Sequence, residues 1–114
     1  MARDVIDVFD AVAAGEEVTF GAINVTNGGK VLAGVEGKLI LMYQADANKA
    51  LTPTISKGIG MNSGIGNLVL PKSEDGAVVV AGPFETERFE QTDGYIYVDY
   101  AAGDVGGILA IRIP

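Results

Sequence analysis

The sequence predicts an all-β fold, a jelly-roll-like antiparallel β-sandwich of about eight strands. Three observations support this fold class. The 114 residues include 16 glycines, which indicate frequent tight turns. Short segments rich in valine and isoleucine recur between the turns and favour strands. Finally, the dipeptide Asp93-Gly94 separates two alternating segments, as expected for a hairpin with a two-residue loop.

The chain is predicted to form one domain over residues 1–114, because no internal repeat or low-complexity linker divides it. This length is sufficient for a hydrophobic core that needs no covalent cross-link.

The Asp93-Gly94 hairpin predicts a specific register. Counting outward from the loop gives these opposite pairs: Thr92 and Tyr95, Gln91 and Ile96, Glu90 and Tyr97, Phe89 and Val98, and Arg88 and Asp99. The core face of the ribbon is then formed by Phe89, Ile96, Val98 and Tyr100. Arg88 and Asp99 would form a cross-strand surface pair.

The N-terminal segment is ambiguous. Val5, Val8, Phe9 and Val12 fit the stripe of an amphipathic helix, whereas their β-branched character favours a strand. Residues 1–14 are therefore predicted to be either a short helix or irregular arm, or a strand. An arm could reach a neighbouring subunit, although packing on its own domain is the simpler expectation.

Further strands are predicted in chain order. Their positions are residues 17–25, 30–33, 38–45, 50–56, 68–71, 77–81 and 107–114. Pro53 lacks a backbone donor, so its strand is expected at a sheet edge or a bulge. Residues 77–81 are apolar throughout and are expected to be a buried strand.

Composition excludes several functions. The chain has no cysteine and no histidine, which removes disulfides, thiol chemistry and imidazole-based catalysis or metal binding. Its net charge of −7 and the lack of a basic stripe argue against nucleic acid and anionic membranes as partners. No apolar segment approaches the roughly 20 residues of a membrane helix, and no signal peptide is recognisable. A partner with a basic surface would fit the charge.

The remaining ionisable groups predict no catalytic, cofactor-binding or metal site, and we expect no enzymatic activity. The acidic residues Glu85, Glu87 and Glu90 do not converge, because the hairpin register places Glu87 and Glu90 on opposite faces. Asp99 and Asp104 could contribute to a calcium site, but no EF-hand spacing is present. The glycines of residues 57–67 match neither dinucleotide-binding nor Walker A spacing.

Two segments carry more apolar side chains than a small sandwich needs. In residues 38–45, Ile40 and Met42 alternate with the core positions, so they require either an internal cover or a partner subunit. In the glycine-rich residues 57–67, Ile59, Met61 and Ile65 either fold back onto the sandwich or insert into a partner.

A predicted interface combines these two segments with the N-terminal segment and with the tyrosines on the solvent-facing side of the hairpin. Its residues are Val5, Phe9, Ile40, Met42, Ile59, Met61, Ile65, Tyr95 and Tyr97.

The order of short motifs over about residues 18–114 resembles that of the capsid decoration (cement) proteins of tailed phages, which are small β-sandwiches. The motifs are Asn24-Val25-Thr26-Asn27-Gly28, Gly37-Lys38-Leu39-Ile40-Leu41, Leu51-Thr52-Pro53-Thr54-Ile55, Gly66-Asn67-Leu68-Val69-Leu70-Pro71, Gly82-Pro83-Phe84-Glu85, Arg88-Phe89 and Asp93-Gly94-Tyr95-Ile96-Tyr97-Val98-Asp99. Residues 1–17 do not match.

The resemblance implies a structural virion protein without catalysis. It implies a jelly-roll-like sandwich that binds the outer surface of the capsid and stabilises it by bridging major capsid protein subunits. It also implies a homo-dimer or homo-trimer that is made in the host cytoplasm. The alternative is a carbohydrate-binding β-sandwich on a virion or cell surface, for which Tyr95 and Tyr97 would provide the aromatic platform.

Overall fold

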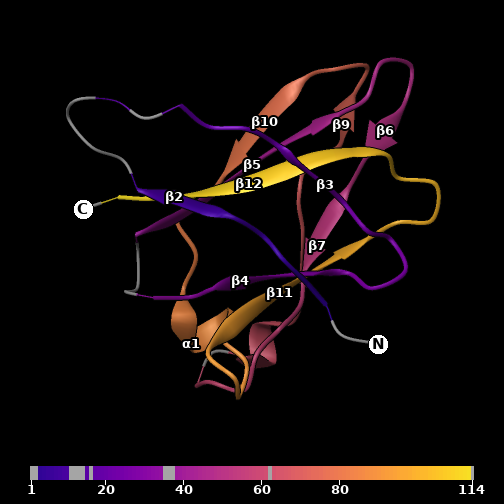
Figure 1. Ribbon diagram of the computed structural model, residues 1–114. Helices are drawn as coiled ribbons and strands as arrows, with labels where there is room; N and C mark the ends of the chain where they lie inside the picture. Colours follow the sequence, from indigo (N-terminus) through magenta and orange to yellow (C-terminus); the bar gives the residue numbers. More distant parts are fainter. Residues whose placement is uncertain (1–2, 11–14, 16, 35–37, 62, 114) are drawn as a thin grey trace.

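The computed structural model describes the chain except residues 1–2, 11–14, 16, 35–37, 62 and 114 (Figure 1). Strands dominate the described part, and its two main sheets pack against each other around one hydrophobic core. The predicted all-β sandwich is thereby confirmed, while the jelly-roll connectivity stays a prediction. The described part has twelve short strands, more than expected, because several predicted segments are interrupted.

The first sheet has the strand order β1-β4-β11-β7-β8. Its strands are β1 (Asp4–Val5), β4 (Gly29–Leu32), β11 (Tyr95–Tyr100), β7 (Pro53–Ile55) and β8 (Leu68–Val69). The second sheet has the order β10-β5-β12-β2, with β3 also beside β12. Its strands are β10 (Val78–Ala81), β5 (Leu39–Ala45), β12 (Gly106–Arg112), β2 (Val8–Asp10) and β3 (Gly21–Ala22).

The remaining elements are short. β6 (Ala50–Leu51) and β9 (Ser73–Glu74) pair with each other, η1 (Ser63–Ile65) is a 3₁₀ turn, and α1 (Thr86–Phe89) is one turn of α-helix. Figure 1 places α1 beside the loop that contains η1 at the bottom of the view, and β10, β9 and β6 at the top.

The core lies between the two main sheets and follows the predicted alternation. Along β5, Leu39, Leu41 and Tyr43 point inward and are fully buried. From the other sheet, Ile96 and Val98 of β11 meet them. Each such buried side chain contributes about 1.5–3 kcal/mol relative to exposure, so this layer dominates the stability of the fold. The hydroxyl of Tyr43 donates to the carbonyl of Pro71.

The N-terminal segment belongs to both sheets. β1 runs parallel to β4, with Asp4 opposite Gly29, and β2 runs parallel to β12, with Phe9 opposite Ile111. Ile6, between the two strands, is buried in the core. The strand interpretation is therefore right for the described residues 4–5 and 8–10 and the helix interpretation is wrong there, while residues 11–14 lie outside the described part.

These contacts settle two further expectations. The described N-terminal residues pack on their own domain, as the simpler interpretation expected. The parallel pairs make the sheets mixed rather than antiparallel throughout.

The helix α1 replaces one strand of the predicted hairpin. The amide of Phe89 donates to the carbonyl of Glu85 at 3.1 Å, and that of Glu90 donates to Thr86 at 3.0 Å. Phe89 is buried as predicted, but it reaches the core from the helix, where its ring meets Phe84 edge-on at 5.9 Å. In this helical arrangement two buried aromatic rings pack together, which gives a physical reason for the difference.

The predicted register is consequently wrong by one residue. Glu90 bridges to Ile96, and Gln91 donates to Tyr95 at 2.8 Å, which leaves a three-residue loop. Gly94 donates back to Gln91 at 3.0 Å and has a φ of 82°. This is the turn followed by a left-handed glycine that three-residue hairpin loops commonly use, and it needs no positive φ at Asp93.

Two further strands differ from expectation. β10 lies at the edge of the second sheet, so Val79 packs against the core while Val78 and Val80 are exposed; a fully buried strand is wrong. β7 lies between β11 and β8, so Pro53 is not at a sheet edge. Pro53 is tolerated because it is the first residue of β7, and β8 pairs only with the two residues that follow it. Of residues 17–25, only β3 forms a strand.

Candidate interaction surfaces

The predicted interface residues fall on three separate surfaces. Ile59, Met61 and Ile65, which we call the loop tip, lie in the glycine-rich loop of residues 57–67. Phe9, Ile40 and Met42 lie on the outer face of the second sheet, and Val5, Tyr95 and Tyr97 lie on the outer face of the first. The structure therefore does not bring them into one site, and each surface is considered in turn.

The base of the glycine-rich loop contacts the end of α1 directly. The amide of Gly58 donates to the carbonyl of Arg88 at 2.7 Å, and that of Ile59 donates to Glu90 at 3.1 Å. A Cβ at position 58 would lie 2.1 Å from the carbonyl oxygen of Glu90, a distance at which no side chain fits. Glycine is therefore required at this position by the close approach of two backbone segments.

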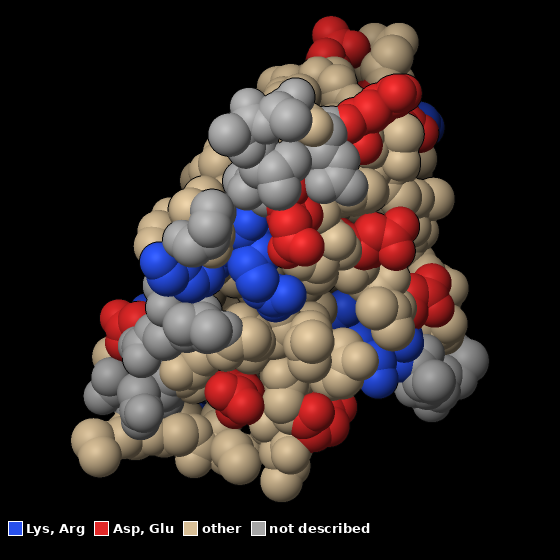
Figure 2. All heavy atoms as spheres, turned by 60° about the vertical axis from the view of Figure 1, so that its left-hand side comes forward, with Lys and Arg blue, Asp and Glu red and all other residues tan. Residues whose placement is uncertain are grey.

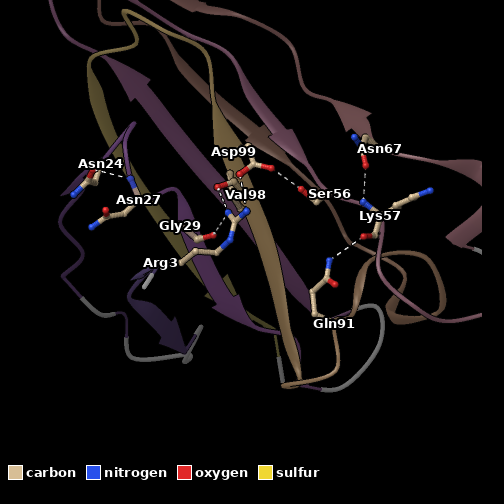
Figure 3. Close-up of polar contacts among 10 residues, drawn as sticks. All are labelled: Arg3, Asn24, Asn27, Gly29, Ser56, Lys57, Asn67, Gln91, Val98 and Asp99. Carbon is tan, nitrogen blue, oxygen red and sulfur yellow. Dashed lines mark hydrogen bonds and ion pairs between the residues drawn. The ribbon is translucent and has the colours of Figure 1, made fainter. Parts of the chain in front are cut away.

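Side chains hold both ends of the loop. Arg88 donates from Nε to the carbonyl of Gly66 at 3.0 Å and from a terminal nitrogen to that of Asn67 at 3.2 Å. Gln91 donates to the carbonyl of Lys57 at 2.8 Å, and the side-chain oxygen of Asn67 accepts from the Lys57 amide at 2.8 Å (Figure 3). We call Arg88, Asn67 and Gln91 the clamp.

The clamp holds both ends of the loop, and hydrogen bonds inside it add to this support. Within it, Ser63 donates to Gly60 at 3.1 Å and Gly66 donates to Ser63 at 3.0 Å, which closes the turn η1. Sequence reasoning did not find the clamp, because Arg88 was assigned to Asp99 and nothing in the residue pattern linked residues 57 and 67 to residue 91.

Asp99 has a different partner from the one predicted. Arg3 forms an ion pair with it at 2.8 Å and also donates to the carbonyls of Gly29 and Val98, both at 3.2 Å (Figure 3). Ser56 donates to the other oxygen of Asp99 at 2.6 Å. The predicted pair of Arg88 with Asp99 is wrong, because α1 takes Arg88 out of the hairpin. The new network ties the N-terminal segment to the residue that precedes the loop.

The side chains of the loop tip are exposed to solvent. The side chains of Ile59, Met61 and Ile65 are 66%, 89% and 64% exposed, so they do not fold back onto the sandwich. Three large apolar side chains that are exposed to water on one loop do not stabilise the folded monomer. Of the two interpretations that the sequence left open, insertion into a partner is the one that these exposures favour.

The outer face of the second sheet is partly covered by the chain itself. The register places Met42 beside Leu109, and Ile40 and Phe9 on either side of Ile111. Leu109 is buried, whereas Met42, Ile40, Phe9 and Ile111 are half-buried. At the far end of β12, the Cβ of Phe20 lies against Gly107. Part of the cover expected for this face is therefore internal, and the most exposed side chains are those of Val78 and Val80 at its β10 edge.

The outer face of the first sheet is more polar. The guanidinium of Arg3 lies 4.4 Å from the ring centre of Tyr97, and the ammonium of Lys30 lies 4.5 Å from that of Tyr95. Tyr97 donates to Asp93 at 2.8 Å, and this hydrogen bond raises the pKa of Tyr97. A cation therefore lies over one face of each ring, which reduces the aromatic surface on which a sugar could stack. The carbohydrate-binding alternative stays a prediction.

The acidic residues do not form a site in the described part of the chain. Asp104 accepts from the amides of Thr52 at 3.0 Å and Ala101 at 2.8 Å, so it braces a turn. No group of three or more carboxylates among the described residues could hold a metal ion. On the face that Figure 2 shows, acidic side chains are scattered, and basic side chains lie between them near the middle of the view.

Comparison with known proteins identifies no relative: no family model, no curated protein and no solved structure matches the chain. In the described residues, no helix has the length and hydropathy to cross a membrane.

Proposed function

We propose that this chain is a structural virion protein that binds the outer surface of a tailed-phage capsid and stabilises it by bridging major capsid protein subunits. The proposal combines the motif resemblance with one structural observation, the exposed loop tip on a loop whose ends are held by the clamp. It assigns no chemical reaction to the chain, because neither histidine nor cysteine is present and the described carboxylates do not converge.

The loop tip is suited to binding a shell of protein. Fully burying a side chain such as Ile or Met contributes about 1.5–3 kcal/mol. Three such side chains on one loop can therefore supply several kcal/mol before the costs of association are counted. The clamp lowers those costs, because a loop that is already ordered loses little conformational entropy on binding. Many copies on one capsid then add their modest contacts.

Charge supports the same kind of partner. The net charge of −7 disfavours association with nucleic acid and favours a shell surface that is basic around an apolar pocket. In this arrangement the apolar loop tip supplies affinity, and the net negative charge of the chain raises the rate of association.

The proposal is tested by binding to capsids. Purified protein is mixed with heads of the phage that encodes it, from which this protein has been removed, and bound protein is measured by sedimentation. We expect saturable binding and a higher temperature of capsid disruption. The variant Met61→Asp should weaken binding by about 30-fold, the equivalent of about 2 kcal/mol of lost apolar burial.

The matched control is Val25→Asp. It adds the same charge at an exposed valine in the turn between β3 and β4, which Figure 1 shows away from the loop that contains η1. The control should bind as the unaltered protein does. Absence of binding by the unaltered protein would refute the proposal, and equal losses in both variants would show that the loop tip is not the contact.

A further inference from the structure

We propose that the free edge of β10 pairs with β10 of a second copy, so that two chains form one continuous sheet across a two-fold axis. β10 pairs with β5 on one side, and within the residues that the structure describes it has no partner strand on the other. Its outward backbone groups are therefore available to another strand.

The outermost strands of the two main sheets, β1, β8, β10 and β2, differ in how they are protected from pairing with another chain. β1 and β8 contain two residues each, β1 includes Asp4, and Pro71 follows shortly after β8. At the opposite edge of the second sheet, β2 includes Asp10. Short length, charge and proline are the features by which proteins prevent pairing between edges. β10 is the longest of these outer strands, with the four residues Val-Val-Val-Ala, and it carries no charge, while Pro83 follows it at the same spacing as Pro71 follows β8.

The outward side chains of β10 are apolar as well. Val78 and Val80 are 49% and 61% exposed, and both lie on the outer face beside Gln44 and Met42 of β5. The edge thus offers free backbone groups together with uncovered apolar side chains. This combination selects a strand of the same character, and it repels one that carries charge.

A second copy satisfies these requirements. Two copies of a strand pair antiparallel when the two-fold axis is perpendicular to the sheet, and residues opposite each other then point to the same face. With Val79 opposite the partner's Val79, Val78 lies beside the partner's Val80. All four exposed valines meet on the outer face. Each copy carries a net charge of −7, so two copies repel each other. Because β10 has no charged residue, this edge adds no local repulsion to the contact.

This arrangement would also place the two loop tips far apart. Figure 1 shows η1 at the bottom of the view and β10 at the top, so a dimer through β10 carries one tip at each end. Under the proposed function, such a dimer would contact two sites on the capsid at once, and the second contact would be favoured by a high effective concentration. This consequence rests on the proposed function, whereas the pairing itself does not.

The test uses the protein alone in solution. Sedimentation velocity over a wide concentration range should show a reversible monomer–dimer equilibrium, weak because a four-residue strand pair is smaller than a standard interface. The double variant Val78→Lys, Val80→Lys should raise the dissociation constant at least tenfold, although it lowers the net negative charge of each chain. The control Leu32→Lys, on β4 in the interior of the first sheet, should leave it unchanged.

A charge-swap experiment tests the proposed contact directly. The lysine double variant is mixed with Val78→Glu, Val80→Glu; each should be monomeric alone, and the mixture should form a heterodimer that salt weakens. Far-ultraviolet circular dichroism verifies that all variants are folded. A monomer at every concentration, a dimer that persists in both double variants, or a mixture that stays monomeric would each overturn the inference. Because no capsid is present, these outcomes are independent of the capsid-binding test.

Discussion

The close contact between Gly58 and the end of α1 gives the sharpest prediction for stability. In the variant Gly58→Ala, the new Cβ would lie 2.1 Å from the Glu90 oxygen and 2.6 Å from the carbonyl carbon of Phe89. Both are backbone atoms, so the loop must move. Overpacking of this kind costs about 1–3 kcal/mol. The movement also weakens the hydrogen bonds from the amides of Gly58 and Ile59, each contributing about 1 kcal/mol. We expect a total loss of roughly 2–4 kcal/mol.

Urea denaturation followed by circular dichroism measures this loss as the free energy of unfolding. The matched control is Gly64→Ala in the same loop, where a Cβ would meet no atom within 4 Å. The control should change the free energy by less than about 0.5 kcal/mol. If Gly58→Ala were as stable as this control, the contact between the loop and α1 would not exist as described.

Two further predictions concern buried hydroxyls. Ser73 is fully buried; its hydroxyl accepts from the Ala45 amide at 2.9 Å and donates to the carbonyl of Ala77. The variant Ser73→Ala should therefore lower the free energy of unfolding by about 2–3 kcal/mol. The control Ser63→Ala, at a half-buried site, should change it little. Burial raises the pKa of Tyr43 to about 12, above its value of about 10 in the unfolded chain. The contribution of the neutral Tyr43 hydroxyl to the free energy of unfolding is therefore complete below pH 10 and is lost as the pH rises towards 12. Tyr43→Phe should therefore be about 1 kcal/mol less stable than the unaltered protein at pH 8 but more stable near pH 12. Urea titrations at both pH values check this reversal, and a difference that keeps its sign would contradict it.

The sequence predicted the parts of the fold that depend on local periodicity. The alternation of residues 38–45 correctly placed Leu39, Leu41 and Tyr43 in the core, because a period of two is a property of the strand itself. The same reasoning identified Ile96 and Val98 as core residues although the register of their hairpin was wrong. A shift caused by α1 changed the partner strand without changing which face of β11 is buried.

Other features depend on contacts between residues that are distant in the sequence, so they could not be predicted from local patterns. An Asp-Gly sequence fits both a two-residue loop and a three-residue loop with glycine last, and packing of Phe84 with Phe89 decides between them. The composition of residues 77–81 indicated burial, but the position of β10 at an edge is set by the order of strands. The clamp was missed for the same reason, while the exposed loop tip was among the residues predicted to meet a partner.

The pairing of β2 with β12 has a consequence for how the protein is made. Residues 8–10 leave the ribosome well before residues 106–112, the segment that contains the strand they pair with. During translation β2 therefore has no pairing strand, and the second sheet cannot close, until residues 106–112 have emerged. Contacts between such distant segments slow folding, so newly made chains should acquire protease resistance only after residue 112 has emerged.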